Sequence, residues 1–177
     1  MNPIPIQPDL RVVEPADALI QSLCATIAGQ PFFQGLSPGH IQLLAASAME
    51  KNFAAGQEIF EAGSPANRFY LILEGRVTLE SEVTDQKLVP VQTLGPGDDL
   101  GWSWLFPPYY LHFSAHALTP VRTVFFYGTR LREQCEQDHE LGYQLMKRIA
   151  EVTTQSLRAT QQRLFEYAGT RKVPPQG

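Results

Sequence analysis

Apolar residues recur every three or four positions in two segments near the N-terminus, and this spacing predicts two helices. The first covers residues 16–29 and ends at Gly29, a residue type that commonly follows a helix. Its apolar positions are Leu19, Ile20, Leu23 and Ile27. The second covers 38–48, because Ser37 can cap it and Pro38 suits the first helical position.

Over residues 50–127 the pattern changes to short apolar runs separated by glycines, which is typical of strands joined by tight turns. In FYLILEGRVTLE (69–80) alternating apolar residues run up to Glu74 and Gly75 and resume at Val77. This predicts two antiparallel strands joined by a turn that needs glycine. Many short strands of this kind predict an antiparallel β-roll or jelly roll.

After Gly128 the pattern is helical again and predicts a short helix over 129–137 and a long one over 138–167. The apolar stripe of the long helix runs through Leu141, Leu145, Ile149 and Val152 and then passes to Leu157, Leu164 and Tyr167. A helix of about 30 residues spans about 45 Å and would overhang a domain of this size. This favours a homodimer, the alternative being a helix wrapped along its own domain. The expected contact residues are Ile149, Val152, Leu157 and Leu164.

Together these elements predict one mainly β domain over 16–167, a β-roll with flanking helices that ends in a short and a long helix. Residues 1–15 contain four prolines and little periodicity, so we expect a flexible arm there. Residues 168–177 are expected to be a disordered tail. Only 10 residues follow Tyr167, so we expect no DNA-binding domain in this chain.

The composition is that of a folded protein, with 44% apolar and 18% charged residues. The net charge of -4 and the scattered Lys and Arg residues disfavour nucleic acid as a partner. No signal-peptide pattern and no apolar run of about 18 residues is present, so we expect a cytoplasmic protein without a membrane partner. Cys24 and Cys135 are too few for a disulfide framework and are predicted to be free thiols.

A family resemblance rests on FAAGQEIFEAGSPANRFYLILEGRVTLE (53–80) and the preceding SPGHIQLLAASA. These segments resemble the cyclic-nucleotide-binding domain of catabolite-activator-type transcription factors, kinase regulatory subunits and gated channels. The matching frame is Gly56, Ile59, Gly63, Phe69, Tyr70, Leu71, Ile72, Gly75 and Val77, followed by LGPGDDLG (94–101) and ALTPVRTVFF (117–126). The similarity extends over roughly residues 31–167.

The resemblance implies a phosphate-binding cassette, in which backbone N–H groups after a glycine face the cyclic phosphate. In the family a glutamate takes the ribose hydroxyl and an arginine pairs with the phosphate. Here Gly101 matches the glycine, but Trp102 stands at the glutamate position. The arginine position falls on Leu111, or on Tyr110 in a shifted alignment, and His112 stands at the neighbouring Ser/Thr position.

The absence of the glutamate and the arginine from the cassette does not depend on the alignment. No arginine occurs between Arg76 and Arg122, and no glutamate occurs between Glu82 and Glu133. A charge-assisted pair to a phosphate contributes about 1.5–3 kcal/mol, or about 10–150-fold in affinity. The sequence therefore predicts that cyclic AMP is not bound in the usual way.

The cassette segment GWSWLFPPYYLHFSA (101–115) is instead rich in aromatic residues. It either forms a remodelled pocket for a flatter or more apolar ligand, or fills the vacated pocket with its own side chains. The candidate pocket residues are Leu100, Gly101, Trp102, Ser103, Trp104, Tyr110, Leu111 and His112.

These observations predict a non-enzymatic regulatory, sensor or scaffold module that needs no cofactor and acts through protein–protein contacts. One alternative is a small-molecule sensor that holds a cyclic nucleotide through backbone N–H groups of 101–105, His112 and tryptophan stacking. A second is a cupin-like metal enzyme using His112 and His116, which would lie on one face of a strand. Asp98 and Asp99 follow a Gly-Pro-Gly turn and are expected to support that turn rather than catalysis.

Overall fold

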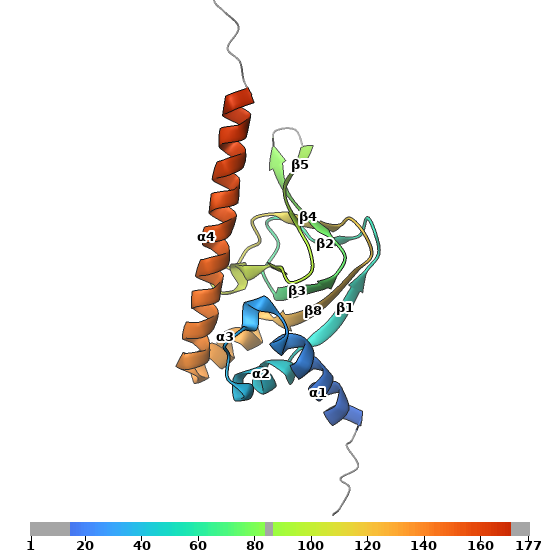
Figure 1. Ribbon diagram of the computed structural model, residues 1–177, viewed down its shortest axis with the longest axis vertical. Helices are drawn as coiled ribbons and strands as arrows, with labels where there is room; N and C mark the ends of the chain where they lie inside the picture. The colour runs from blue at the N-terminus through green and yellow to red at the C-terminus, as the bar shows by residue number, and fades with distance from the viewer. Residues whose placement is uncertain (1–14, 84–86, 171–177) are drawn as a thin grey trace, which may run out of the picture.

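The computed structural model describes residues 15–83 and 87–170. The helical elements are α1 (Pro15–Ala28), η1 (Pro31–Phe33), α2 (Pro38–Ala45), η2 (Trp102–Trp104), α3 (Gly128–Gln137) and α4 (His139–Thr170). The strands are β1 (Met49–Phe53), β2 (Glu58–Phe60), β3 (Arg68–Glu74), β4 (Val77–Val83), β5 (Lys87–Leu94), β6 (Asp99–Leu100), β7 (Ser114–Ala117) and β8 (Val121–Tyr127). The mainly β fold with flanking helices is confirmed (Figure 1).

Two four-stranded antiparallel sheets form the β-roll. Their strand orders are β1-β8-β3-β6 and β2-β7-β4-β5. One apolar core lies between the sheets and includes Tyr70 and Ile72. A second core lies between the first sheet and the helices and includes Phe69 and Leu71. Because both faces of β3 are buried, its sequence is a continuous apolar run rather than a clean alternation.

The turn between β3 and β4 needs glycine for two reasons. Gly75 has a φ of +90°, a conformation that side chains with a Cβ disfavour. A Cβ built on Gly75 would also lie 2.2 Å from the carbonyl oxygen of Pro120. The glycine turn predicted from the sequence is therefore present, but the predicted pairing of its two strands is wrong. β3 pairs with β6 and β8 and β4 pairs with β5 and β7, so the turn carries the chain from the first sheet to the second.

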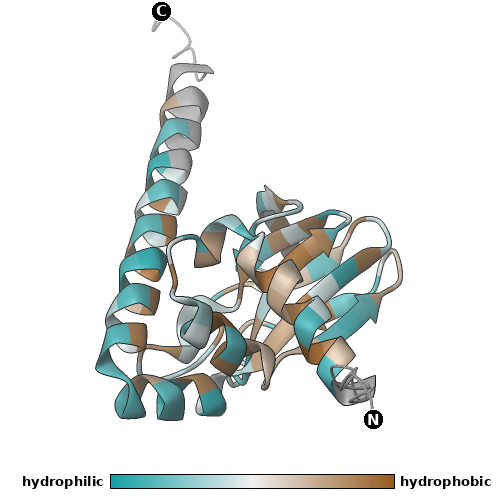
Figure 2. Ribbon diagram, turned by 60° about the horizontal axis from the view of Figure 1, so that its bottom comes forward, coloured by the Kyte–Doolittle hydropathy of each residue, from teal (hydrophilic) through white to brown (hydrophobic). Residues whose placement is uncertain are grey.

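The helices pack around the outer face of the first sheet. Leu141, Leu145 and Ile149 on α4 are buried in the helix-side core together with side chains of α1, α2 and η1. The C-terminal part of α4 extends beyond this body (Figure 2). Among the described residues, no helix is long and apolar enough to cross a bilayer.

Several element ends differ from the predicted ones. The second helix ends at Ala45 rather than at residue 48, because the chain turns there to enter β1. The long helix continues to Thr170, so residues 168–170 of the predicted tail are helical. Pro15 belongs to α1 and not to the predicted arm. The rest of the arm, residues 1–14, and residues 171–177 lie outside the described part of the chain.

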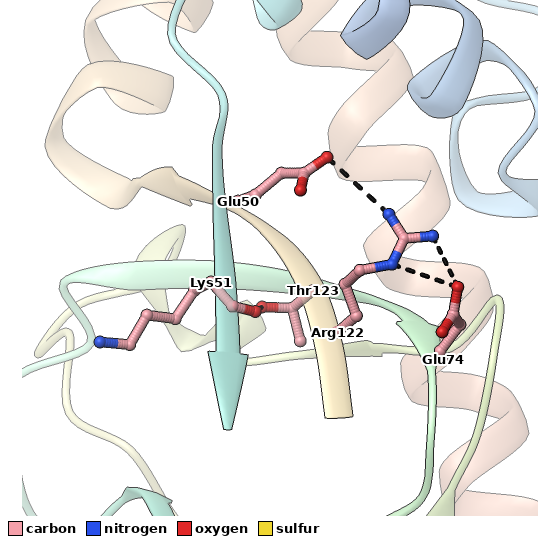
Figure 3. A network of polar contacts seen from close by, with 5 residues as sticks. All are labelled: Glu50, Lys51, Glu74, Arg122 and Thr123. Atoms are coloured by element: carbon pink, nitrogen blue, oxygen red, sulfur yellow. Dashed lines mark hydrogen bonds and ion pairs between the residues drawn. The ribbon is translucent and has the colours of Figure 1, made fainter. Parts of the chain in front are cut away.

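One polar network connects three neighbouring strands of the first sheet (Figure 3). Arg122 on β8 lies 2.7 Å from a carboxylate oxygen of Glu74 on β3 and 3.8 Å from one of Glu50 on β1. The hydroxyl of Thr123 donates to the carbonyl oxygen of Lys51 at 2.8 Å. These contacts link the side chains and backbone of β1, β8 and β3, which lie next to one another in the sheet.

Candidate functional site

A cavity of about 470 Å³ lies between the cassette, η1 and α4. Its walls come from β6 and η2 on one side, from Pro31 and Phe32 of η1, and from residues 148–156 of α4. Gly101, the residue immediately before η2, has a φ of +84°, and a Cβ there would lie 2.6 Å from the carbonyl oxygen of Arg68. Glycine is therefore the residue that lets the cassette lie against β3.

Six of the eight predicted pocket residues line this cavity. They are Leu100, Gly101, Trp102, Ser103, Leu111 and His112. The structure places Trp104 and Tyr110 elsewhere. Trp104 is fully buried in the helix-side core, with its ring 6.2 Å from that of Phe69. Tyr110 is 48% exposed and forms an isolated bridge with Pro65.

The aromatic side chains of the cassette do not fill the cavity. Phe106, Tyr109 and Tyr110 are exposed, and the guanidinium of Arg132 lies over the Tyr109 ring at 4.4 Å. Trp102 is half-buried at the cavity wall, with its ring centroid 6.3 Å from that of His112. The cavity that remains has the size of a small-molecule site.

The backbone N–H groups of the cassette are only partly free to meet a ligand. Trp104 N–H donates to the carbonyl of Gly101 at 3.4 Å, and Leu105 N–H donates to that of Trp102 at 3.3 Å. The short helix η2 therefore uses two of the donors that the sequence suggested for a phosphate.

Arg148 is a lining residue that the sequence reasoning missed. It comes from α4 and lies 47 positions after Gly101 in the chain, so no local pattern links it to the cassette. Its guanidinium bonds to the carbonyl oxygen of Gln34 and lies 3.3 Å from a carboxylate oxygen of Glu151. The cassette has no arginine, but the cavity has one from α4. The guanidinium of this Arg148 already has protein partners.

Asp98 and Asp99 have different roles. The carboxylate of Asp98 accepts from the N–H of Gly95 at 2.8 Å, as expected of a turn residue. Asp99 is 8% exposed, and burial, followed by the charge of Asp98, raises the pKa of its carboxyl to about 7. Its Oδ2 makes no hydrogen bond with any described residue.

The two histidines of the metal hypothesis do not share a strand face. His112 precedes β7 and lines the cavity, whereas His116 lies within β7. The Nδ1 of His116 is 2.9 Å from Glu80, and its Nε2 is 3.8 Å from Glu58. Those carboxylates come from β4 and β2, which the sheet places beside β7. Within the described ranges, no group of three or more His, Cys, Asp or Glu side chains is arranged to hold a metal ion.

A β-roll whose glycine-led cassette faces a long C-terminal helix across a cavity is the fold of a class of regulatory domains. Residues 50–138 match the model of the cyclic nucleotide-binding domain, and the chain belongs to this family. The family is regulatory rather than enzymatic.

Two proteins with detectable sequence similarity to this chain belong to the same kind of protein. A CRP-like cAMP-activated global transcriptional regulator of Mycobacterium tuberculosis is 29% identical over 124 residues, which cover 70% of this chain and 55% of the regulator. The chain thus spans about half the length of the curated relatives it matches. A Geobacter metallireducens protein assigned as a cyclic nucleotide-binding protein is 34% identical with a TM-score of 0.68, covering 75% of this chain and 96% of that one.

A more distant structure shares the fold. The regulatory subunit of a cAMP-independent protein kinase A from Trypanosoma brucei is 24% identical with a TM-score of 0.69. The match covers 84% of this chain and 53% of that subunit. The β-roll and its helices are therefore used in transcription regulators and in regulatory subunits.

Proposed function

We propose that this protein is a non-enzymatic regulatory module of the cytoplasm, a sensor or scaffold that acts through protein–protein contacts and does not bind cyclic AMP in the usual way. One observation carries this proposal. The cassette keeps Gly101 but has Trp102 and Leu111 where the resemblance implies a glutamate and an arginine. The fold of the family is retained while the two side chains that grip the nucleotide are replaced.

The cavity also has the wrong charge for a phosphate. Asp98, Asp99 and Glu151 line it, and the one lining guanidinium among the described residues is that of Arg148. A cyclic phosphate would meet the carboxylates of Asp98 and Glu151 and the carboxyl group of Asp99 instead of a free guanidinium, which disfavours its binding.

The protein–protein part of the proposal is a homodimer formed through the second half of α4. Leu157 is 57% exposed and Phe165 is 73% exposed on a helix that extends past the domain. Ile149, which the sequence placed at the contact, is fully buried in its own domain, and Val152 is half-buried against the same core. The side chain of Leu164 lies outside the described part of the chain.

Light scattering at tens of micromolar protein tests the dimer. We expect a dimer for the wild type and a monomer for Leu157→Asp, because a carboxylate would be buried in an apolar contact. Leu19→Asp is the matched control, since Leu19 is 59% exposed on α1, and we expect it to remain dimeric. A monomeric wild type would contradict the homodimer.

Thermal unfolding with cyclic AMP and cyclic GMP tests the loss of the usual ligand. A ligand at 100 times its dissociation constant adds about 2.7 kcal/mol to stability. For a chain of this length the midpoint would rise by roughly 5–11 °C. We expect no such rise at millimolar nucleotide, and a rise of that size would contradict the proposal.

A second candidate function is a small-molecule sensor, which the open cavity of about 470 Å³ favours. Trp102 lies at its wall, so a bound ligand should change tryptophan emission, whereas Trp104 is buried away from it. A ligand-dependent change in emission that is lost in Trp102→Phe would support this function. A change that persists in that variant would place the ligand elsewhere.

A further inference from the structure

Asp99 presents a carboxyl group at the cavity wall whose Oδ2 has no protein donor, although the carboxyl also accepts from its own backbone N–H. Its side chain is 8% exposed, and Oδ2 makes no hydrogen bond with the described residues. In the register of β6 and β3 Asp99 pairs with Leu71, a residue of the helix-side core. Paired residues of antiparallel strands share a face, so the carboxyl leaves the sheet on the side of η1 and α4. A ligand that donates a hydrogen bond is the simplest partner for such a group.

The other charged residues around the cavity indicate whether that ligand is a cation or an anion. Asp98 and Glu151 line the same cavity, from the cassette turn and from α4. Arg148 faces it as well, but its guanidinium is engaged by Glu151 and by the carbonyl oxygen of Gln34. The lining therefore has more negative than positive charge, which attracts a cation and repels an anion.

The cavity also offers an aromatic surface close to these carboxylates. Trp102 is half-buried at the wall, and its ring is tilted by 40° from that of His112 at 6.3 Å. Phe32 lines the cavity from η1. An indole face attracts a nearby cation and stacks on a planar ring, so the two features suit one ligand that is both planar and positively charged.

We propose that the cavity binds a small aromatic cation, whose N–H groups donate to the Asp99 carboxylate while its ring lies against Trp102. This inference rests on the proposed regulatory function and names its ligand class. The ligand site of the fold is kept, and its charge preference is reversed from a cyclic phosphate to an organic cation.

Three probes of nearly equal shape test the charge preference: benzamidine, benzamide and benzoate, which are a cation, a neutral molecule and an anion. Each is titrated into the ¹⁵N-labelled full chain while the amide signals of Gly101, Trp102 and Ser103 are followed. We expect saturable shifts with affinity falling in the order benzamidine, benzamide, benzoate. Benzoate that binds as well as benzamidine, or benzamidine that leaves these signals unmoved at millimolar concentration, would overturn the proposal.

Two variants that remove the same charge test the role of Asp99. Asp99→Asn should lower the affinity for benzamidine by about ten-fold or more, because a charge-assisted hydrogen bond is lost. Asp98→Asn removes an exposed neighbouring carboxylate. It should lower the affinity for benzamidine by less than about three-fold, as expected when a solvent-screened charge is lost. Equal affinity of the wild type and Asp99→Asn would overturn the assignment of this residue.

The pH dependence provides a readout that a purely structural role would not give. Burial raises the pKa of Asp99 to about 7, so benzamidine affinity should rise as the carboxyl ionises between about pH 6 and about pH 8. The other charged groups that line the cavity with Asp99 are Asp98, Glu151 and Arg148. His112→Asn is the control for the lining imidazole and should keep the rise. A pH-independent affinity would contradict the proposal.

The failure of this inference is distinguishable from the failure of the proposed function. The oligomeric state and the response to cyclic AMP are measured on the same samples without reference to the benzamidine series. A dimer that ignores both cyclic AMP and benzamidine overturns only the ligand class. A response to cyclic AMP overturns the proposed function itself.

Discussion

Replacing Asp99 by asparagine removes one titrating group from the interior while almost conserving the volume of the side chain. In the folded chain burial raises the pKa of Asp99 from 3.8 to about 7, with the charge of Asp98 as a second cause. The folded state therefore holds the Asp99 proton more tightly than the unfolded state does. Wild-type stability from this group is fully present below about pH 4 and is lost as the pH rises to about 7.

The size of this stability change follows from the difference between the folded and unfolded pKa values of Asp99. About three pH units of difference, at about 1.4 kcal/mol each, correspond to a loss of up to about 4 kcal/mol. Asparagine does not titrate, so the variant lacks this loss. The free energy of unfolding of Asp99→Asn minus that of the wild type should rise by up to this amount between about pH 4 and about pH 7 and then stay constant.

Urea unfolding at a series of pH values, followed by tryptophan emission, measures this difference. The lowered pKa of Asp138, caused first by the hydrogen bond from Leu141 N–H, is common to both proteins and cancels. Asp98→Asn is the control: its amide oxygen can still accept from Gly95 N–H, and because Asp99 is retained its stability should still fall between about pH 4 and about pH 7. A difference between Asp99→Asn and the wild type that does not change with pH would refute the reasoning.

Three further predictions concern the fold. Gly75→Ala should cost at least about 3 kcal/mol by urea unfolding, because the new Cβ meets a carbonyl at 2.2 Å. Gly63→Ala, with a φ of +78° but open space around it, should cost only about 1–2 kcal/mol. Trp104→Ala should lower the free energy of unfolding by about 3–5 kcal/mol, because the Trp104 ring is fully buried. Trp102→Ala should lower it by about 1 kcal/mol, because Trp102 is half-buried. Comparable losses for the two variants would contradict the placement of the two rings. Arg122→Met should cost no more than about 1 kcal/mol, and the cost should shrink further in salt, because its ion pairs are exposed.

The sequence determined the features that depend on neighbours along the chain. Gly75 between two apolar runs predicted the β3–β4 turn, and the helical spacing of Leu141 and Leu145 predicted the face of α4 that the domain buries. Six of the predicted pocket residues also meet at one cavity, because they lie in two short segments of one cassette. Turn geometry and helix periodicity are local properties, so residue order is enough to predict them.

The tertiary structure alone decided which distant groups meet and which side chains are removed from water. Arg148 reaches the cavity because α4 packs against the cassette, and Glu58 and Glu80 reach His116 because β2 and β4 flank β7. Ile149 belongs to its own core rather than to a dimer contact for the same reason. The raised pKa of Asp99 likewise has no local signature. Desolvation depends on everything that surrounds a group, and that is set by how the sheets and helices pack rather than by the residues next to it in the chain.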